Sequence, residues 1–129
     1  QMSLKAASTL MANIMNGRRY MPFWVQLLLG GTDSEGSHVY SLDAAGGSIP
    51  DQFQTTGSGS PFVYGVLEDR FKENMSVAEG KKLGVRALVA AMKRDSASGD
   101  GISMCVINSD GFQKVSPEEI KKIETTLAD

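Results

Sequence analysis

The spacing of apolar residues predicts an amphipathic helix near the start of the chain, over residues 3–16. Apolar side chains recur there on one stripe of the helix surface: Leu4, Ala7, Met11, Ile14 and Met15. The near-continuous apolar run Phe23–Leu29 is typical of a strand covered on both faces. His38–Asp43 and the more polar segment Ser48–Thr56 predict two further strands, separated by turn-rich sequence. The first half therefore predicts a helix followed by an antiparallel sheet.

The second half of the chain carries clear helix-start signals. Ser60-Pro61 places a capping hydroxyl and a proline at the beginning of one helix. Ser76-Val77-Ala78-Glu79 is a capping box that begins another, which we expect to end near Asp95. Apolar residues at the spacing of one buried helix face follow this capping box: Val85, Leu88, Val89 and Met92.

The last part of the chain predicts a short hairpin and a final helix. Ile102–Ile107 and Phe112–Val115 are the expected strands, joined by a turn at Asn108–Gly111. Ser116-Pro117-Glu118-Glu119 combines a capping box with a first-turn proline. The predicted order is one helix, three strands, two helices, two strands and one helix. Strands and helices grouped in this way indicate an α+β fold with helices layered on sheets.

Composition places the chain among ordinary globular domains. Its 129 residues suit one domain, and 41% of them are hydrophobic. The net charge of −2 gives no reason to expect a nucleic-acid or membrane partner, and no apolar run approaches the roughly 20 residues of a membrane span. The single Cys105 indicates a reducing compartment, the cytoplasm, and within its apolar run we expect it to be a small buried hydrophobe.

Two clusters of Ser, Gly and Asp are the strongest chemical signal in the sequence. They are Gly57-Ser58-Gly59-Ser60-Pro61 and Asp95-Ser96-Ala97-Ser98-Gly99, each placed at the end of a predicted helix. Such polar groups need hydrogen-bond partners wherever they are shielded from water. Asp95 also opposes the negative end of the helix that precedes it. This placement predicts a specific cationic or amide partner for its carboxylate.

Other sites are less well supported by the sequence. Gly57–Ser60 precedes a helix N-terminus, which suits an anion, but no Lys-Ser or Lys-Thr pair follows as in a phosphate-binding loop. His38 is the only histidine, so any Ser-His-Asp triad would have to use it. One His and one Cys make a zinc site improbable. The acidic turn Asp33–Glu35 is best interpreted as solvated. We therefore predict no metal and no cofactor.

Four segments resemble a known family. Thr56-Gly-Ser-Gly-Ser-Pro-Phe-Val-Tyr-Gly-Val-Leu-Glu68 and Arg94-Asp-Ser-Ala-Ser-Gly99 are similar to two signatures of archaeal-type proteasome β subunits. Tyr20–Gly31 and Tyr40–Gly47 fit the same family. The resemblance extends from about Leu4 to the C-terminus without an obvious gap.

This resemblance implies an N-terminal-nucleophile hydrolase fold, a four-layer αββα sandwich with two antiparallel sheets between helical layers. Members of the family form heptameric rings of β subunits, stacked with rings of α subunits into a barrel that degrades unfolded proteins. Their nucleophile is the hydroxyl of an N-terminal threonine, and the α-amino group of that threonine helps to take the proton.

Three residues of this chain match family positions around the threonine amine. Ser58 matches the serine of the Gly-Ser-Gly loop, and Asp95 and Ser98 match the aspartate and serine of the Asp-x-x-Ser-Gly motif. The resemblance implies that they hold the amine in place and set its protonation. A carboxylate with two hydroxyls supplies the acceptors that an ammonium group requires. By the same resemblance, Asp43 is expected to face the substrate channel of a neighbouring subunit.

The chain also departs from the family pattern. It begins in what resembles the second helix, so we expect a single domain equal to about the last two thirds of a β subunit. The catalytic threonine and the aspartate and lysine that assist it would lie upstream, because neither Thr9 nor Thr32 is terminal. The leading hypothesis is a threonine endopeptidase subunit whose separate 129-residue chain is inactive. The alternatives are a non-catalytic structural or assembly subunit and a small anion-binding module at Gly57–Ser60. Apolar surface such as Phe23–Leu29 predicts self-association, or a retained upstream partner segment.

Overall fold

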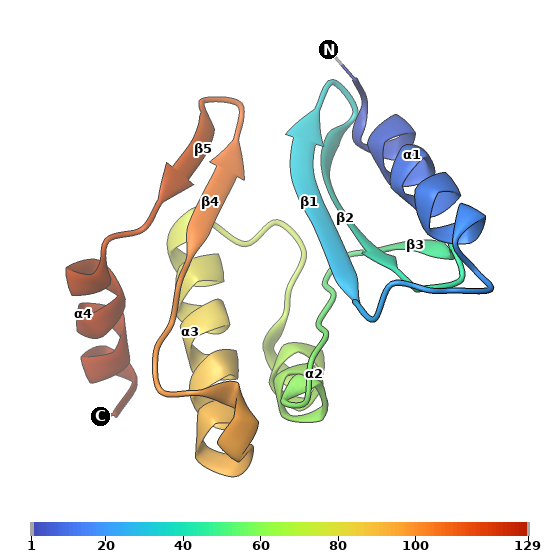
Figure 1. The fold of residues 1–129 in the computed structure, drawn as a ribbon. Helices are drawn as coiled ribbons and strands as arrows, with labels where there is room; N and C mark the ends of the chain where they lie inside the picture. The colour runs from blue at the N-terminus through green and yellow to red at the C-terminus, as the bar shows by residue number, and fades with distance from the viewer. Residues whose placement is uncertain (1, 129) are drawn as a thin grey trace. The chain divides into compact units, whose positions relative to one another are not determined.

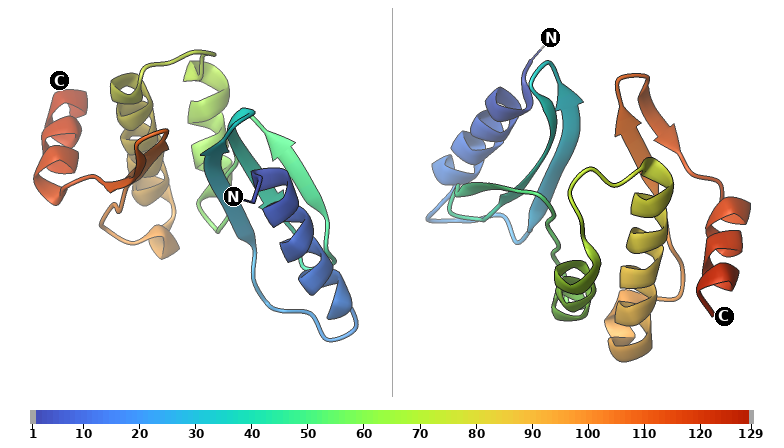
Figure 2. Two further views of the ribbon diagram at one scale, coloured as in Figure 1. Left: turned by 90° about the horizontal axis from the view of Figure 1, so that it is seen from above. Right: turned by 180° about the vertical axis from the view of Figure 1, so that it is seen from behind.

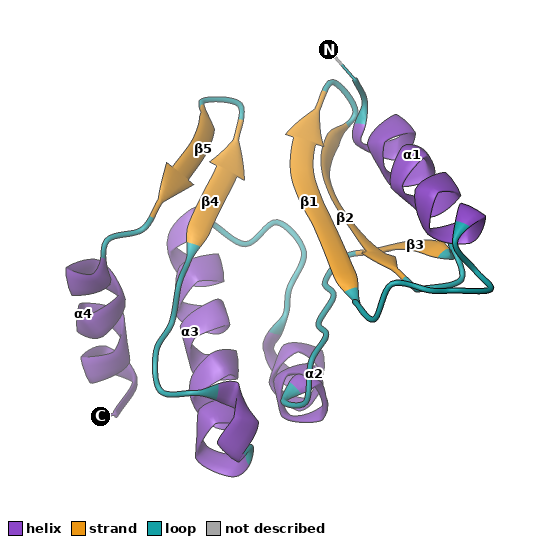
Figure 3. Ribbon diagram, in the orientation of Figure 1, coloured by secondary structure: helices purple, strands orange, loops and turns teal. Residues whose placement is uncertain are grey.

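The computed structural model describes residues 2–128. Figures 1 and 3 show helices and antiparallel strands in the order that the sequence predicts: one helix, three strands, two helices, two strands and one helix. The mixed α+β class is thereby confirmed. The described chain divides into two compact units, residues 2–56 with 107–111 and residues 57–106 with 112–128. Each unit is described separately below.

The first unit is a three-stranded sheet with one helix on it. The strands β1 (Leu27–Asp33), β2 (Gly36–Leu42) and β3 (Ser48–Asp51) are antiparallel neighbours in the order β1-β2-β3. The helix α1 (Leu4–Gly17) begins at the N-cap Ser3, whose hydroxyl accepts the Ala6 N–H, and crosses one face of this sheet (Figure 2).

Strand register decides which side chains α1 covers. Tyr40 lies opposite Leu29, and Leu42 lies opposite Leu27. Tyr40 and Leu42 are buried, together with Ala12 and Met15 of α1. Because side chains alternate along a strand, Leu28 points to the opposite face of the sheet and is exposed. The core of this unit therefore lies on one side of the sheet.

The predicted strand Phe23–Leu29 is wrong in its position and in its burial. Only its last three residues belong to β1, which continues through Gly30 and Gly31 to Asp33. A Cβ on Gly31 would lie 2.9 Å from a methyl carbon of Leu4, so glycine is what lets α1 approach the strand here. The start of the apolar run is exposed, with Trp24 97% accessible. A continuous apolar run does not itself indicate where a strand begins.

The second unit is built around its longest helix. The helices α2 (Ser60–Arg70), α3 (Val77–Arg94) and α4 (Pro117–Ala128) lie side by side with α3 in the middle (Figures 1 and 2). A 3₁₀ turn, η1 (Ser96–Ser98), follows α3. The strands β4 (Cys105–Asn108) and β5 (Gly111–Lys114) form a two-stranded hairpin, of which residues 107–111 are grouped with the first unit.

Helix α3 packs on two sides at once. On one side, Ala87 and Ala91 contact Val63 of α2. On the other, Val85 forms a cluster with Val115 and with Ile120 of α4. The expected face included Leu88, which is exposed, and it omitted the two alanines. The spacing of large apolar residues does not indicate these alanines, because they are buried only through the close approach of α2.

Cys105 is also not where the sequence placed it. The thiol is exposed, whereas Val106 packs against the cluster around Val85. Neighbouring residues of a strand point to opposite faces, so only one of the two can contact that cluster. The prediction that Cys105 is buried is wrong for this reason.

The predicted capping box of α3 is confirmed. The Ser76 hydroxyl accepts the Glu79 N–H at 3.2 Å, and the Glu79 carboxylate accepts the Ser76 N–H at 2.8 Å. The hydrogen bonds to Ser76 hold the pKa of Glu79 below its usual value. A negative side chain in the first turn also suits the positive end of the helix.

The substitution Val85→Ala tests whether α3 organises the second unit. Val85 is completely buried, so we expect the free energy of unfolding to fall by about 2 kcal/mol. Val77→Ala makes the same chemical change on the same helix at a residue that is 51% exposed, and it should have little effect. Hydrogen exchange of the α3 amides measures both. Equal effects of the two substitutions would contradict this description of the core.

Candidate functional site

The three residues predicted to act together do meet in the structure. The hydroxyl groups of Ser58 and Ser98 both donate to the same oxygen of Asp95, Oδ2, each at an O–O distance of 2.6 Å. Ser58 precedes α2, whereas Asp95 and Ser98 follow α3. Residues 37 positions apart in the chain are therefore joined through one carboxylate.

Gly59 is what allows the two loops to come so close. It is the N-cap of α2, and it is buried against the end of α3. A Cβ built on Gly59 would lie 2.4 Å from the Ser98 hydroxyl oxygen and 3.0 Å from the Cβ of Ala91. Any side chain larger than hydrogen would therefore push α2 away from Ser98 and Asp95.

Asp95 links local and long-range contacts. Its N–H donates to Ala91 at the end of α3, and its Oδ1 accepts the N–H of Ala97 at 3.2 Å, which caps η1. The negative charge of Asp95 is unfavourable at the negative end of α3. The hydrogen bond from Ser58, which lies just before α2, also places this charge near the positive end of α2, and that position is favourable. The expected amide partner of Asp95 is thus present, whereas residues 2–128 supply no cation to it.

The hydrogen bonds lower the pKa of Asp95 below its usual value of 3.8. The Ser58 hydroxyl contributes most, followed by the Ser98 hydroxyl and then the Ala97 N–H, while partial burial acts in the opposite direction. Donors favour the charged form of a carboxyl group because they stabilise its negative oxygens. Asp95 is therefore a carboxylate at neutral pH.

The arrangement presents acceptors to its surroundings. Each serine donates its one hydroxyl proton to Asp95, so the remaining lone pairs of both hydroxyls accept hydrogen bonds. A carboxylate and two oriented hydroxyls suit an incoming N–H donor, and a positively charged one best. The same negative charge disfavours a phosphate at Gly57–Ser60, where the Ser60 N–H already donates to the carbonyl of Gly57.

Asp43 belongs to the first unit, whereas Ser58, Asp95 and Ser98 belong to the second. Its Oδ1 accepts the N–H groups of Ala45 and Gly47, at 2.9 and 2.8 Å, and so closes the turn after β2. The amide of Asn16 donates to the carbonyl of Ala45 and ties the same turn to α1. The structure thus gives Asp43 a role in the turn, and its contact with substrate stays a prediction.

Asp33 is a residue whose importance the sequence did not reveal. The sequence predicts a solvated turn here, yet the two carboxylate oxygens of Asp33 accept the N–H groups of Leu4 and Glu35, at 2.8 and 2.9 Å. The Leu4 N–H is the main cause of its lowered pKa. His38 Nε2 lies 3.4 Å from Asp33 Oδ1. The carboxylate beside the only histidine is therefore one that already binds the backbone N–H groups of Leu4 and Glu35.

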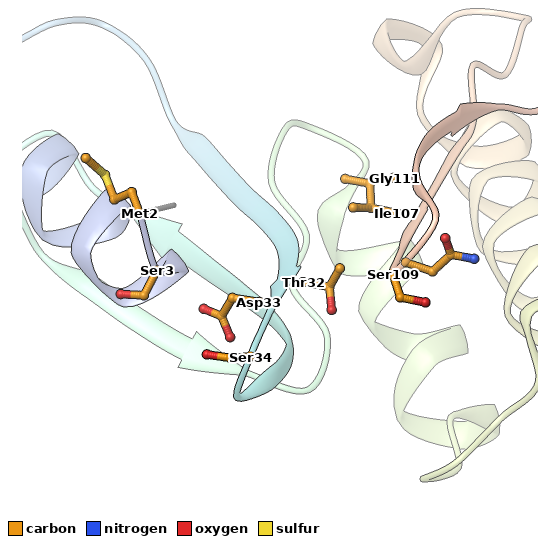
Figure 4. Close-up of a pocket in the computed structure, with 9 residues that line it drawn as sticks. Met2, Ser3, Thr32, Asp33, Ser34, Ile107, Ser109 and Gly111 are labelled. Atoms are coloured by element: carbon orange, nitrogen blue, oxygen red, sulfur yellow. The ribbon is translucent and has the colours of Figure 1, made fainter.

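Figure 4 shows Asp33 with Ser3, Thr32 and Ser34 at a pocket of about 470 Å³ in the first unit. None of the predicted site residues lines that pocket. Within residues 2–128, no three His, Cys, Asp or Glu side chains are grouped as metal ligands would be. Over the same range, no helix combines the length and the apolar character that crossing a bilayer requires.

Comparison with known proteins identifies the family. The family described as "Proteasome subunit" matches residues 1–107, a stretch that includes Ser58, Asp95 and Ser98. The chain belongs to the proteasome subunit family. It is 51% identical to a proteasome subunit beta of Methanosarcina barkeri and 52% identical to that of Methanosarcina thermophila, in each case over 98% of this chain.

A third relative, the proteasome subunit beta of Archaeoglobus fulgidus, is 52% identical over 94% of the chain. The resemblance to archaeal β subunits is thereby confirmed. The chain spans about 60% of the length of these curated relatives: 60% for the two Methanosarcina proteins and 57% for the Archaeoglobus protein.

The substitution Gly59→Ala tests the close approach of α2 to α3. The added methyl group must displace the Ser98 hydroxyl, so we expect a loss of about 1–3 kcal/mol in stability, as for other overpacked sites. Gly65→Ala is the matched control, because it lies in the same helix with no atom within 4 Å of the added Cβ. That change should stabilise by up to about 1 kcal/mol. Urea unfolding of both variants measures these changes in the free energy of unfolding. A Gly59→Ala variant as stable as the wild type would contradict this packing.

The titration of Asp95 tests the hydrogen bonds. Because its folded-state pKa lies below 3.8, ionised Asp95 stabilises the fold above that pH, and this stabilisation is lost as the pH falls below 3.8. Ser58→Ala should raise the midpoint seen by carboxyl-carbon NMR more than Ser98→Ala does. Ser96→Ala, a neighbouring exposed serine, should leave it unchanged. A Ser58→Ala variant with the wild-type midpoint is the contradicting result.

Proposed function

We propose that this chain is part of a proteasome β subunit that acts as a threonine-type endopeptidase. Ser58, Asp95 and Ser98 hold the α-amino group of an N-terminal threonine, which a part of the subunit outside these 129 residues provides. The observation that carries the proposal is the shared Asp95 Oδ2, which leaves an ionised carboxylate and two hydroxyls as acceptors for one N–H donor. The similarity to archaeal β subunits over 98% of the chain supports it.

The chemistry assigns a distinct task to each group. The threonine hydroxyl attacks the carbonyl carbon of the peptide bond, and its proton passes to the neighbouring amine. The amine becomes an ammonium group, which the negative charge of Asp95 stabilises. The proton then goes to the leaving nitrogen as the peptide C–N bond breaks, and water hydrolyses the ester that remains on the threonine. The two serine hydroxyls fix the position of the nitrogen through their lone pairs. All three are positioning residues, because they act on the reaction through the amine.

The family also supports a proposal for the assembly. In it, the subunit adopts the complete four-layer αββα sandwich and forms a heptameric β ring that stacks with α rings. The barrel degrades unfolded proteins in the cytoplasm. The names of the relatives, proteasome subunit beta, support the membership in such a particle. The separate 129-residue chain, without the threonine, is expected to be inactive.

The experiment compares Asp95→Asn with Asp100→Asn in the full-length subunit, assembled with its α subunits. Asp100 is an exposed carboxylate five residues away, so it controls for the lost charge. We expect Asp95→Asn to lower kcat for a fluorogenic peptide by about 100-fold or more, with KM little changed. Without the carboxylate the ammonium form is less stable, so the acid limb of the pH–rate profile should move to lower pH.

Two results would overturn the proposal. One is an Asp95→Asn particle with the kinetics and pH profile of the Asp100→Asn particle. The other is a wild-type particle that cleaves no peptide and whose β subunit, by intact mass, carries no N-terminal threonine. The second result would favour the alternative, a non-catalytic structural or assembly subunit.

A further inference from the structure

The loop that carries Ser58 is exposed, so its position has to be fixed by contacts on both sides. It connects β3, which ends at Asp51, to α2, which begins at Ser60. Ser58 and its hydrogen bond to Asp95 are open to solvent, where water competes for the same acceptor. A side chain in such a loop stays on one acceptor only where the backbone that carries it is itself held, because entropy favours the free conformations of a loop.

Thr56 is held by a residue that is distant in the sequence. Its hydroxyl group donates a hydrogen bond to the Oε1 atom of Gln26, and the two residues are 30 positions apart. Gln26 immediately precedes β1, whose first residue, Leu27, pairs with the buried Leu42 of β2. All four residues belong to the first unit. The acceptor for Thr56 is therefore attached to the start of a paired strand and not to another loop.

Gly57 makes this hydrogen bond relevant to Ser58. It lies between Thr56 and Ser58 with a φ angle of +96°, a conformation that glycine adopts readily and other residues rarely. On its other side, the Ser60 N–H donates to the Gly57 carbonyl at 3.0 Å and closes a turn. Glycine loses more conformational freedom on ordering than any other residue. Holding the chain at Thr56 as well as at this turn removes that freedom, and the restraint reaches Ser58 along the backbone.

We propose that Thr56 and Gln26 are positioning residues. Their hydrogen bond holds the entry to the loop, so that the Ser58 hydroxyl stays on Asp95. Thr56 gives its one hydroxyl proton to Gln26, so it acts through Ser58 and not on the threonine amine itself. The importance of Thr56 for peptide cleavage rests on the function proposed above, whereas its effect on Ser58 does not. The two parts are therefore tested by separate measurements.

The first measurement is the titration of Asp95 by carboxyl-carbon NMR in the 129-residue chain. Thr56→Val replaces the hydroxyl with a methyl group of similar size, so Ser58 should leave Asp95 more often. The midpoint should then rise toward 3.8, by no more than Ser58→Ala raises it, because the Ser58 hydroxyl is what lowers it most. Gln26→Met removes the acceptor and should give the same rise.

Three controls separate this effect from a general change in the loop. Thr56→Ser retains the hydroxyl group and should keep the wild-type midpoint. Thr55→Val makes the same chemical change one residue earlier, outside the hydrogen bond to Gln26, and should also keep it. In the double variant of Thr56→Val with Ser58→Ala, the midpoint should equal that of Ser58→Ala alone, since Thr56 acts only through Ser58.

The second measurement is peptide cleavage by the full-length subunit assembled with its α subunits. We expect Thr56→Val to lower kcat about 2- to 10-fold, the range that corresponds to one net hydrogen bond, and to leave KM little changed. Thr56→Ser should restore kcat, and Thr55→Val should retain it. The loss should be smaller than that caused by Asp95→Asn, because the carboxylate and Ser98 still hold the amine.

Four results would overturn this inference. The Thr56→Val chain has the wild-type midpoint, Thr55→Val raises the midpoint equally, or the double variant exceeds Ser58→Ala. In the particle, Thr56→Val leaves kcat at the wild-type value although Asp95→Asn impairs cleavage. Failure of the proposed function gives a different pattern: Thr56→Val raises the Asp95 midpoint, but neither it nor Asp95→Asn changes kcat. The peptidase proposal is then wrong, and the effect of Thr56 on Ser58 is supported.

Discussion

The contact on which the second unit depends is the approach of the α2 N-terminus to the C-terminal end of α3. It requires glycine at position 59, where any Cβ would collide with Ser98 and Ala91. It also requires an acceptor for the polar groups that this approach brings together, and Asp95 supplies one oxygen for two hydroxyls. The same contact therefore packs the two helix ends together and gives their hydroxyl groups a hydrogen-bond acceptor. A ligand that binds there meets a rigid set of acceptors because the same atoms hold the two helices.

The two sides of α3 contact different helices, α2 on one side and α4 on the other. Ala87 and Ala91 are small enough to let α2 lie close, and this closeness positions Ser58 beside Asp95. On the other side, larger residues around Val85 hold α4. The stripe between these two contacts is only partly covered: Arg86, Val89 and Ala90 are partly exposed and Lys93 is exposed. Val89 lies there beside the cationic side chains of Arg86 and Lys93.

In the first unit, carboxylates close the turns and hold the start of α1. Asp33 accepts hydrogen bonds from the start of α1 and from its own turn, and so fixes the helix to the end of the β1–β2 hairpin. Gly31 then allows Leu4 to lie against the strand. Asp43 closes the next turn in the same way. Asp33 and Asp43 in this unit therefore accept hydrogen bonds from backbone N–H groups, whereas Asp95 in the second unit also accepts two serine hydroxyls.

The sequence by itself determined the order of the elements, the capping box at Ser76 and the membership of Ser58, Asp95 and Ser98 in one recognisable set. These signals act over a few residues, through caps, turns and short motifs, so they survive without knowledge of the neighbours. Only the tertiary structure decided that β1 begins at Leu27, that Leu88 and Cys105 are exposed, and that Asp33 holds α1. Burial and long-range hydrogen bonds depend on which elements approach one another. Apolar spacing shows that a face is buried somewhere, but a neighbour such as α2 decides which residues of that face it covers.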